Sequence, residues 1–175
     1  MANSITSLAQ LENYFADLVV TLLGMEADHV LIAYAEMGQN FSTPGQDYCF
    51  VWAKELTDDV QMYKNRKEGP VPNNKWKIAQ TSMRKVQIMF SFYGEHSDVN
   101  ALSLKEALYF PDTNISLDQN NLALIPVDVD LTTVKEQINE VYWTRSDLTV
   151  NFYNSVTFEQ TVNTINSLDL TISTK

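Results

Sequence analysis

Residues 84–111, RKVQIMFSFYGEHSDVNALSLKEALYFP, decide the fold of this chain. In their first part every second side chain is large and apolar, namely Val86, Ile88, Phe90 and Phe92. A period of two is typical of a strand with one face in a core and the other facing water or a partner. The pattern therefore predicts a half-buried strand that runs to Tyr93.

Signals for a turn and a helix follow this strand. Gly94 can adopt the positive φ that a sharp exit needs, and Ser97 is placed to cap the first backbone N–H groups of a helix. This helix is predicted to run to about Tyr109. Phe110 and Pro111 then end it, because a residue before proline avoids the α conformation. The segment indicates an architecture and contains no catalytic group.

The residues before this segment predict two helices and one strand. Apolar residues recur at spacings of three and four between Ser7 and Leu23, with a capping-box pair at Ser7 and Gln10 and a left-handed stop at Gly24. A shorter helix is predicted over residues 28–37, ending at a glycine. Residues 38–47 have a loop composition, and the aromatic and branched residues 48–56 predict a strand.

Residues 57–80 are predicted to form a mobile basic excursion. Residues 60–63 have the composition of a short strand. Residues 64–74 are rich in charged, glycine, proline and asparagine residues, which is typical of a loop. Residues 76–78 are expected to return to the sheet.

The C-terminal part predicts further strands. A loop through Asn120 and Asn121 leads to a strand over residues 122–129, and residues 133–136 carry a capping-box pattern for a short helix or turn. Apolar residues alternate again at residues 148–152, within a long segment from 142 to 158, and a last strand is expected at 168–172. Strands on both sides of the central helix predict one α+β domain over residues 1–175. We expect a mixed or mainly antiparallel sheet of about five strands with two or three helices packed on it.

The charge of the chain is negative and unevenly distributed. Its 175 residues carry a formal net charge of −10. Residues 1–53 hold six acids and no Lys or Arg, residues 54–85 hold eight bases and four acids, and residues 86–175 hold twelve acids and four bases. This balance disfavours a free nucleic-acid binder, because such affinity comes mainly from bases that neutralise phosphates. With no apolar run of about 18 residues and no signal-peptide pattern, we expect no membrane contact and a chain that stays in the cytoplasm where it is made.

Few residues here are suited to catalysis or to binding a metal or cofactor. Cys49 is the only cysteine and is expected to be a small buried apolar residue. His29 and His96 have no second set of ligands at zinc spacing, and nucleotide-binding and nucleophile-elbow motifs are absent from the sequence. We therefore expect no enzyme activity, no cofactor and no metal.

Two acidic pairs are candidates for acid catalysis or metal binding. Asp128 and Asp130 alternate at the end of a predicted strand, and Asp58 and Asp59 are adjacent. Neither pair comes with the further carboxylates, carbonyls and glycine turn of a calcium loop. Solvated acidic turns are the preferred interpretation of both.

The basic residues of the middle segment are the candidate contact with another subunit or partner. These residues are Lys64, Arg66, Lys67, Lys75, Lys77, Arg84 and Lys85. A basic middle between acidic flanks allows the arm of one subunit to dock on the acidic surface of the next. Such a contact is heterologous, and it closes into a ring only if its rotation divides a full turn. A solvated loop and a phosphate-binding arm are the alternatives.

Three stretches resemble one family. They are residues 80–94, which end in SFYG, the helix ALSLKEAL at residues 101–108, and YWTRSDL at residues 142–148. Together, over nearly the whole chain, they resemble the phage neck and tail terminator proteins.

This resemblance implies α+β subunits that assemble, typically as hexamers, into a ring at the head-proximal end of a phage tail. There they stop tail tube polymerisation and join the tail to the head. The implied partners are further copies of the chain, the tail tube protein and the head–tail connector protein. DNA is implied to pass without sequence-specific binding, and no catalytic residue is implied. We expect a virion protein that assembles in the host cytoplasm. Another connector or tail-completion protein and an acidic, non-enzymatic binding module are the alternatives.

Overall fold

The computed structural model describes residues 5–33, 46–57, 64–72, 75–138 and 140–163. The described elements are, in order, α1 (Leu8–Leu23), the 3-10 turn η1 (Ala27–His29), β1 (Val30–Ile32), β2 (Tyr48–Leu56), β3 (Lys64–Val71), β4 (Lys75–Tyr93), α2 (Ser97–Ala107), α3 (Pro111–Gln119), β5 (Leu122–Ile138) and β6 (Val141–Asn163).

These strands form one six-stranded sheet, in the order β1-β2-β4-β6-β5, with β3 paired to β4. β1 is parallel to β2, and the other pairs are antiparallel. The prediction of a single α+β domain with a mixed, mainly antiparallel sheet is therefore confirmed, with six described strands instead of about five.

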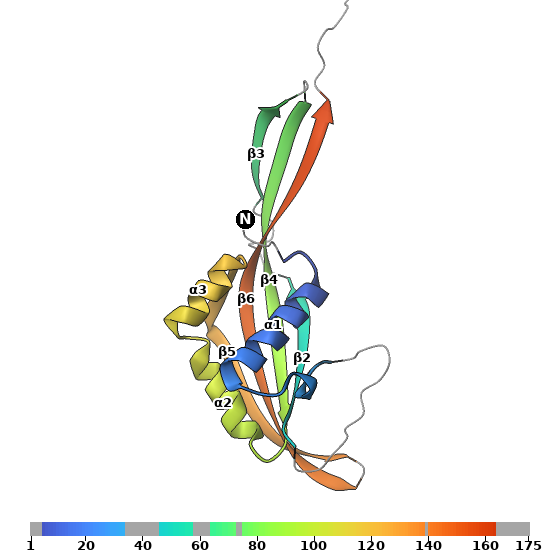
Figure 1. The fold of residues 1–175 in the computed structure, drawn as a ribbon, viewed down its shortest axis with the longest axis vertical. Coiled ribbons are helices and arrows are strands. Elements are labelled where there is room, and N and C mark those ends of the chain that lie inside the picture. Colours follow the sequence, from blue (N-terminus) through green and yellow to red (C-terminus); the bar gives the residue numbers. More distant parts are fainter. Residues whose placement is uncertain (1–4, 34–45, 58–63, 73–74, 139, 164–175) are drawn as a thin grey trace, which may run out of the picture.

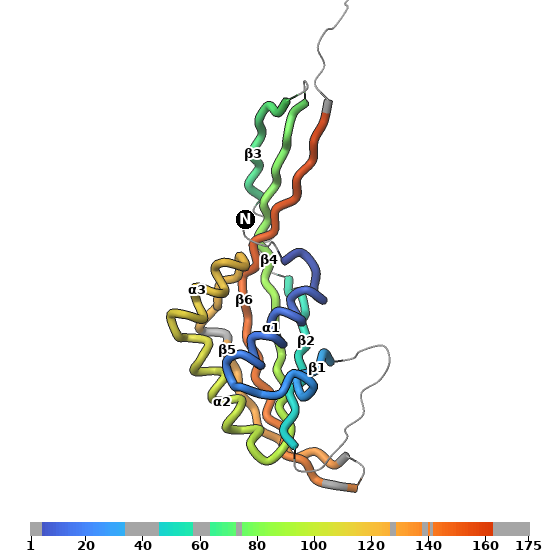
Figure 2. The backbone as a smooth tube through the Cα atoms, viewed as in Figure 1, coloured from blue at the N-terminus to red at the C-terminus, as the bar shows by residue number. Residues whose placement is uncertain are grey.

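The two longest strands divide the molecule into two parts. β4 has 19 residues and β6 has 23, and they pair with each other from Lys75 to Tyr93 of β4. The C-terminal half of β4 also pairs with β2, whereas its N-terminal half pairs with β3. We call the part that carries the helices the body. The extension comprises β3, residues 75–83 of β4 and residues 155–163 of β6, and it projects from one end of the body (Figures 1 and 2).

The core lies between the body sheet and the three helices, which cover one face of it (Figure 1). The four alternating side chains of β4 that the sequence placed inside, from Val86 to Phe92, are all fully buried. Phe15 of α1 packs between Phe90 and Phe152, at ring-centroid distances of 5.9 and 4.7 Å. Cys49 is fully buried in the same core, as predicted. No described helix is long and apolar enough to span a membrane.

Two of the sequence signals around helices and turns are confirmed in detail. The Ser7 hydroxyl accepts a hydrogen bond from the Gln10 N–H, and the Gln10 side chain accepts one from the Ser7 N–H, both at 3.1 Å. Gly24 ends α1 in the left-handed conformation, with φ 67°. Gly94 has φ 119°, so the sharp exit from β4 does use a conformation that favours glycine.

The predicted cap of α2 is wrong. Ser97 is the first residue of the helix instead of its cap, and its buried hydroxyl has no hydrogen-bond partner among the described residues. The carboxylate of Asp47 takes that role from outside the helix. It accepts a hydrogen bond from the His96 N–H at 3.0 Å, and its second oxygen lies 2.9 Å from His96 Nδ1. A cap supplied by a distant residue leaves no local pattern in the sequence.

Proline at residue 111 begins a helix as well as following one. α2 ends at Ala107, near the predicted end at Tyr109, and α3 starts at Pro111 with Phe110 as its N-cap residue. Proline is well suited to the first turn of a helix, where its missing N–H has no intrahelical partner. Proline is predicted from the sequence only to end a helix, and therefore α3 is not predicted.

Three further expectations differ from the structure. The helix over residues 28–37 is wrong where the structure describes it, because η1 and β1 occupy residues 27–32 and β1 pairs with β2. The loop at residues 64–74 is wrong over β3, which pairs with β4 along its length. The capping-box pattern at residues 133–136 lies inside β5, where the branched residues Thr133 and Val134 suit a strand.

Other expectations fall outside the described residues. These are the glycine that ends the second helix, most of the loop at 38–47, the short strand at 60–63 and the strand at 168–172.

Candidate assembly surfaces

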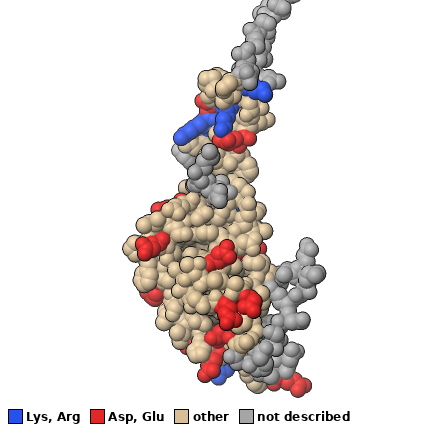
Figure 3. Space-filling view, viewed as in Figure 1, with Lys and Arg blue, Asp and Glu red and all other residues tan. Residues whose placement is uncertain are grey.

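The extension gathers most of the basic residues that the sequence analysis selected. Lys64, Arg66 and Lys67 lie on β3, and Lys75 and Lys77 lie at the start of β4. Residues 64–71, 75–83 and 155–163 hold these five bases and two Glu, a net charge of +3. On the face seen in Figure 3, the visible Lys and Arg lie mainly on this part, next to a few acids, whereas most of the visible Asp and Glu lie on the body.

Strand pairing places these bases on two opposite faces. Lys64 and Arg66 pair with Ser82 and Gln80, on the face that continues the helix-covered face of the body. Lys67 pairs with Ala79 and therefore lies on the other face, together with Lys75 and Lys77. Arg84 follows the first group and Lys85 the second, at the start of the body. The seven residues thus do not form one patch.

Ion pairs within the extension involve two of its bases. Arg66 contacts Glu68, and Lys77 Nζ lies 2.8 Å from Glu159 Oε1. Their side chains are 41–57% exposed, so each pair contributes only about 0.2–1 kcal/mol. Lys64, Lys67 and Lys75 form no ion pair with another described residue.

Apolar side chains occupy the same face of the extension as Lys64 and Arg66. Trp76 and Ile78 of β4 are partly buried, and Phe158 of β6, which pairs with Gln80, is 61% exposed. No described helix covers this face. These residues are not among the candidates selected from the sequence, although the period of two in β6 continues to Phe158. We call this surface, with Lys64 and Arg66, the extension face.

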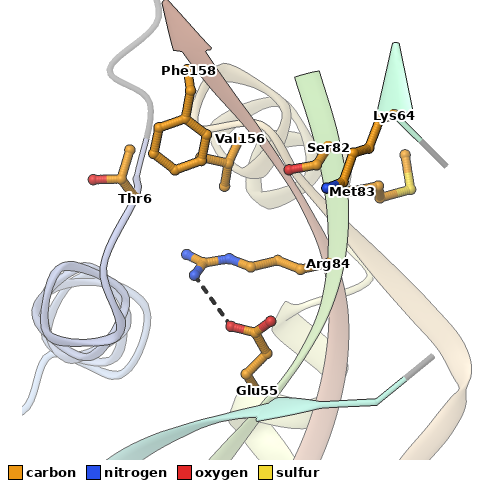
Figure 4. A pocket seen from close by; sticks show the side chains of 8 residues that line it. All are labelled: Thr6, Glu55, Lys64, Ser82, Met83, Arg84, Val156 and Phe158. Carbon is orange, nitrogen blue, oxygen red and sulfur yellow. Dashed lines mark ion pairs between the residues drawn. The ribbon is translucent and has the colours of Figure 1, made fainter. Parts of the chain in front are cut away.

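A notch lies at the foot of the extension face, where it meets the body (Figure 4). It has a volume of about 290 Å³ and is lined by charged, polar and apolar residues: Thr6, Glu55, Lys64, Ser82, Met83, Arg84, Val156 and Phe158. Arg84 Nε donates to Asn154 Oδ1 at 2.8 Å, and its Nη1 lies 3.6 Å from Glu55 Oε2. Its Nη2 is buried without a hydrogen-bond partner among the described residues. The described residues therefore leave part of the donor capacity of this guanidinium unused.

The outer surface of α2 and α3 is the second unusual area. Large apolar side chains are exposed along it: Val99 is 57% exposed, Leu102 50%, Phe110 60% and Ile115 55%. Residues 94–119 carry five acids and one lysine, a net charge of −4 without histidine. The two helices follow one another along one edge of the body (Figure 1). Exposed apolar residues gathered among charged ones are typical of an interaction site. We call this area the α2–α3 surface.

On the other face of the body, an aromatic and charged group surrounds Tyr93. Its hydroxyl donates to Glu136 Oε2 at 3.1 Å, and Arg145 Nη1 donates to the same oxygen at 2.7 Å. Arg145 also lies 3.0 Å from Asp147 Oδ2. Burial raises the pKa of Tyr93 above its usual value. These residues join β4, β5 and β6 and stabilise the sheet.

One group of described residues has the arrangement of a possible metal ligand set. Potential ligand atoms of Glu26, Asp28 and His29 lie within 4.8 Å of one another around η1. Both acids are exposed, which is common without any metal. Of the acidic pairs weighed from the sequence, Asp130 lies inside β5 opposite Thr149, whereas the side chain of Asp128 and residues 58–59 are outside the described part.

Taken together, a single α+β domain with a projecting basic extension and an exposed apolar and acidic helical surface has the features of a subunit that binds other proteins. Comparison with protein-family models is consistent with such a subunit. Residues 9–175 match the model described as phage neck terminator protein. The chain belongs to this family, as the resemblance implied, and it is a structural component of the phage neck and tail. A search of curated proteins found no match.

Proposed function

We propose that the chain forms a hexameric ring at the head-proximal end of a phage tail. The ring stops polymerisation of the tail tube and joins the tail to the head–tail connector. The observation that carries this proposal is the match to the neck terminator family over residues 9–175. The extension and the α2–α3 surface support it, because two different contact areas on one subunit suit a head-to-tail ring.

We propose that DNA passes through this ring, as the family resemblance implies, and the charge of the subunit supports this. Six copies at −10 each carry about sixty excess negative charges. An acidic lumen repels phosphates and leaves the duplex without fixed contacts, whereas a basic lumen adds affinity at every step. We propose that the lumen is acidic. A ring structure with a lumen dominated by Lys and Arg would contradict this part of the proposal.

The proposal is tested by mass and shape. Light scattering over a range of protein concentrations is expected to give a hexamer, and electron microscopy of the same sample is expected to show rings with a central hole. Phage made without this protein should carry tail tubes of uncontrolled length that fail to join heads. A chain that stays monomeric at high concentration and also on purified tail tubes would refute the ring.

Two alternatives predict different outcomes. A connector or tail-completion protein of the same family would leave tail length unchanged and stop only the joining of tails to heads. An acidic binding module would be a monomer or dimer with a concave apolar pocket. The notch is instead lined by charged and polar as well as apolar side chains, and it does not favour that class. We propose that the chain has no catalytic activity.

A further inference from the structure

We propose that the extension face of one copy docks on the α2–α3 surface of a second copy. The inference rests on the proposed ring and specifies the contact that builds it. The occupant of the extension face is therefore another molecule of this same chain.

The extension face has the chemistry of a docking surface. Trp76, Ile78 and Phe158 provide an apolar centre, and Lys64 and Arg66 provide positive charge beside it. Aromatic side chains and arginine are the residues most enriched where proteins bind one another. Covering an apolar sheet face removes it from water, which is favourable, and no described helix of the same chain covers this one.

The α2–α3 surface is complementary to it in both respects. Its exposed apolar residues, such as Leu102 and Ile115, match the apolar centre of the extension face. Its net charge of −4 is opposite in sign to that of the extension face, where Lys64, Arg66 and Glu68 sum to +1. Opposite charges around an apolar contact fix orientation and disfavour wrong partners.

The position of the two surfaces requires a second molecule. The extension points away from the body, so its tip does not rest on α2 of the same chain (Figure 1). In the proposed ring each copy offers one surface to each of two neighbours, and the contact is then heterologous.

Reciprocal charge reversal tests this contact. The first variant, Lys64→Glu with Arg66→Glu, reverses the extension face. The second, Glu106→Lys with Asp118→Lys, reverses exposed acids on the α2–α3 surface, near helix ends where lysine suits the helix dipole. The first variant makes the extension face negative opposite an acidic surface, and the second lowers the net charge of the α2–α3 surface from −4 to zero, so each loses the charge complementarity of the contact. We expect the dissociation constant of each variant to rise at least tenfold. In a 1:1 mixture with alternating copies, the two substituted surfaces meet at one contact with opposite charges at the substituted positions, and the two unchanged surfaces meet at the next, so we expect rings to form again.

The opposite face of the extension supplies a matched control. Lys67→Glu with Lys77→Glu makes the same change of charge and, like the first variant, breaks one ion pair within the extension. This control is expected to assemble nearly as the wild type does.

Thermal melting shows whether each variant is folded. If a reversal variant unfolds, Phe158→Ala removes a 61% exposed apolar side chain without changing charge and is expected to weaken assembly at least fivefold.

The possible results separate this contact from the ring itself. If the wild type forms rings and the first variant forms them equally well, or if a mixture of folded variants forms none, the proposed contact is wrong although the ring itself is supported. Wild-type protein that never assembles would overturn both. Ring assembly by the mixture, together with no assembly by either variant alone, supports the contact between the extension face and the α2–α3 surface.

Discussion

Replacing Gly94 with alanine tests the turn that joins β4 to α2. A Cβ atom at this position would lie 2.2 Å from Asp47 Oδ1, 2.9 Å from Asp47 Cα and 2.9 Å from Gln46 O. Two of these atoms belong to the backbone and cannot move away by a side-chain rotation. The φ of 119° adds strain for any residue with a side chain.

The magnitude follows from three costs that act at one place. Strained backbone costs about 1–3 kcal/mol, and forcing an extra carbon into a packed site costs about 1–3 kcal/mol. Displacing the Asp47 carboxylate also weakens the cap at the start of α2, which costs about 0.5–2 kcal/mol. Because one backbone shift relieves part of each, we expect the free energy of unfolding to fall by about 3–6 kcal/mol in total. This is a large part of the roughly 5–15 kcal/mol of a typical domain.

Urea denaturation followed by tryptophan fluorescence measures this loss. Gly69→Ala is the matched control, because no atom lies within 4 Å of its added Cβ and its φ is not positive. We expect the control to change the free energy of unfolding by less than about 1 kcal/mol. A loss in Gly94→Ala that is no larger than in the control would refute the argument. In an Asp47→Ala background the cost of Gly94→Ala should fall, since the closest contact is then gone.

Three other predictions concern buried groups. Phe15→Ala should lower the free energy of unfolding by about 3–5 kcal/mol in urea denaturation, because its ring fills the core between Phe90 and Phe152; a loss below about 1 kcal/mol would contradict this packing. Burial raises the folded-state pKa of Tyr93 above 10.0, so its contribution to stability is complete below about pH 10 and is lost as the pH rises through the raised value. Tyr93→Phe should therefore lose less stability than the wild type between about pH 9 and 11, and equal losses would count against the assignment. Burial also raises the pKa of Cys49 well above 9.0, so iodoacetamide should modify this thiol only when urea opens the fold; rapid labelling of folded protein would show that the site is accessible.

Much of the body could be predicted from sequence because its signals are local. The alternation from Val86 to Phe92 has a period that a helix does not produce, and the Ser7 capping box lies within four residues. Both are decided by neighbours along the chain. The turn at Gly94 could also be predicted, because a sharp exit from a strand needs a positive φ that few other residues adopt.

The errors have a common physical origin in contacts between distant residues. Asp47 caps a helix that begins fifty residues later, so no spacing rule finds it. β1 is a strand because β2 lies beside it, although its sequence also suits a helix turn. Strand β3 contains glycine and proline, which are typical of a loop, yet it pairs along the N-terminal half of β4, which β2 does not reach.

For the candidate interface, the sequence indicated which residues are basic but not how they are arranged. Only the pairing of Lys64 and Lys67 with successive residues of β4 shows that they point to opposite faces. The apolar part of the extension face was hidden for the same reason, since Trp76 and Phe158 are 82 positions apart in the chain, counting from 76 to 158. The acidic α2–α3 surface was missed with α3 itself.

The unbroken pairing of β4 and β6 has a mechanical consequence. Both strands pass from the extension into the core without interruption, and each residue of β4 is matched along the way. A pull along the strands therefore loads many hydrogen bonds in shear at the same time. Force applied at the tip is therefore transmitted along the two continuous strands to the aromatic residues of the body.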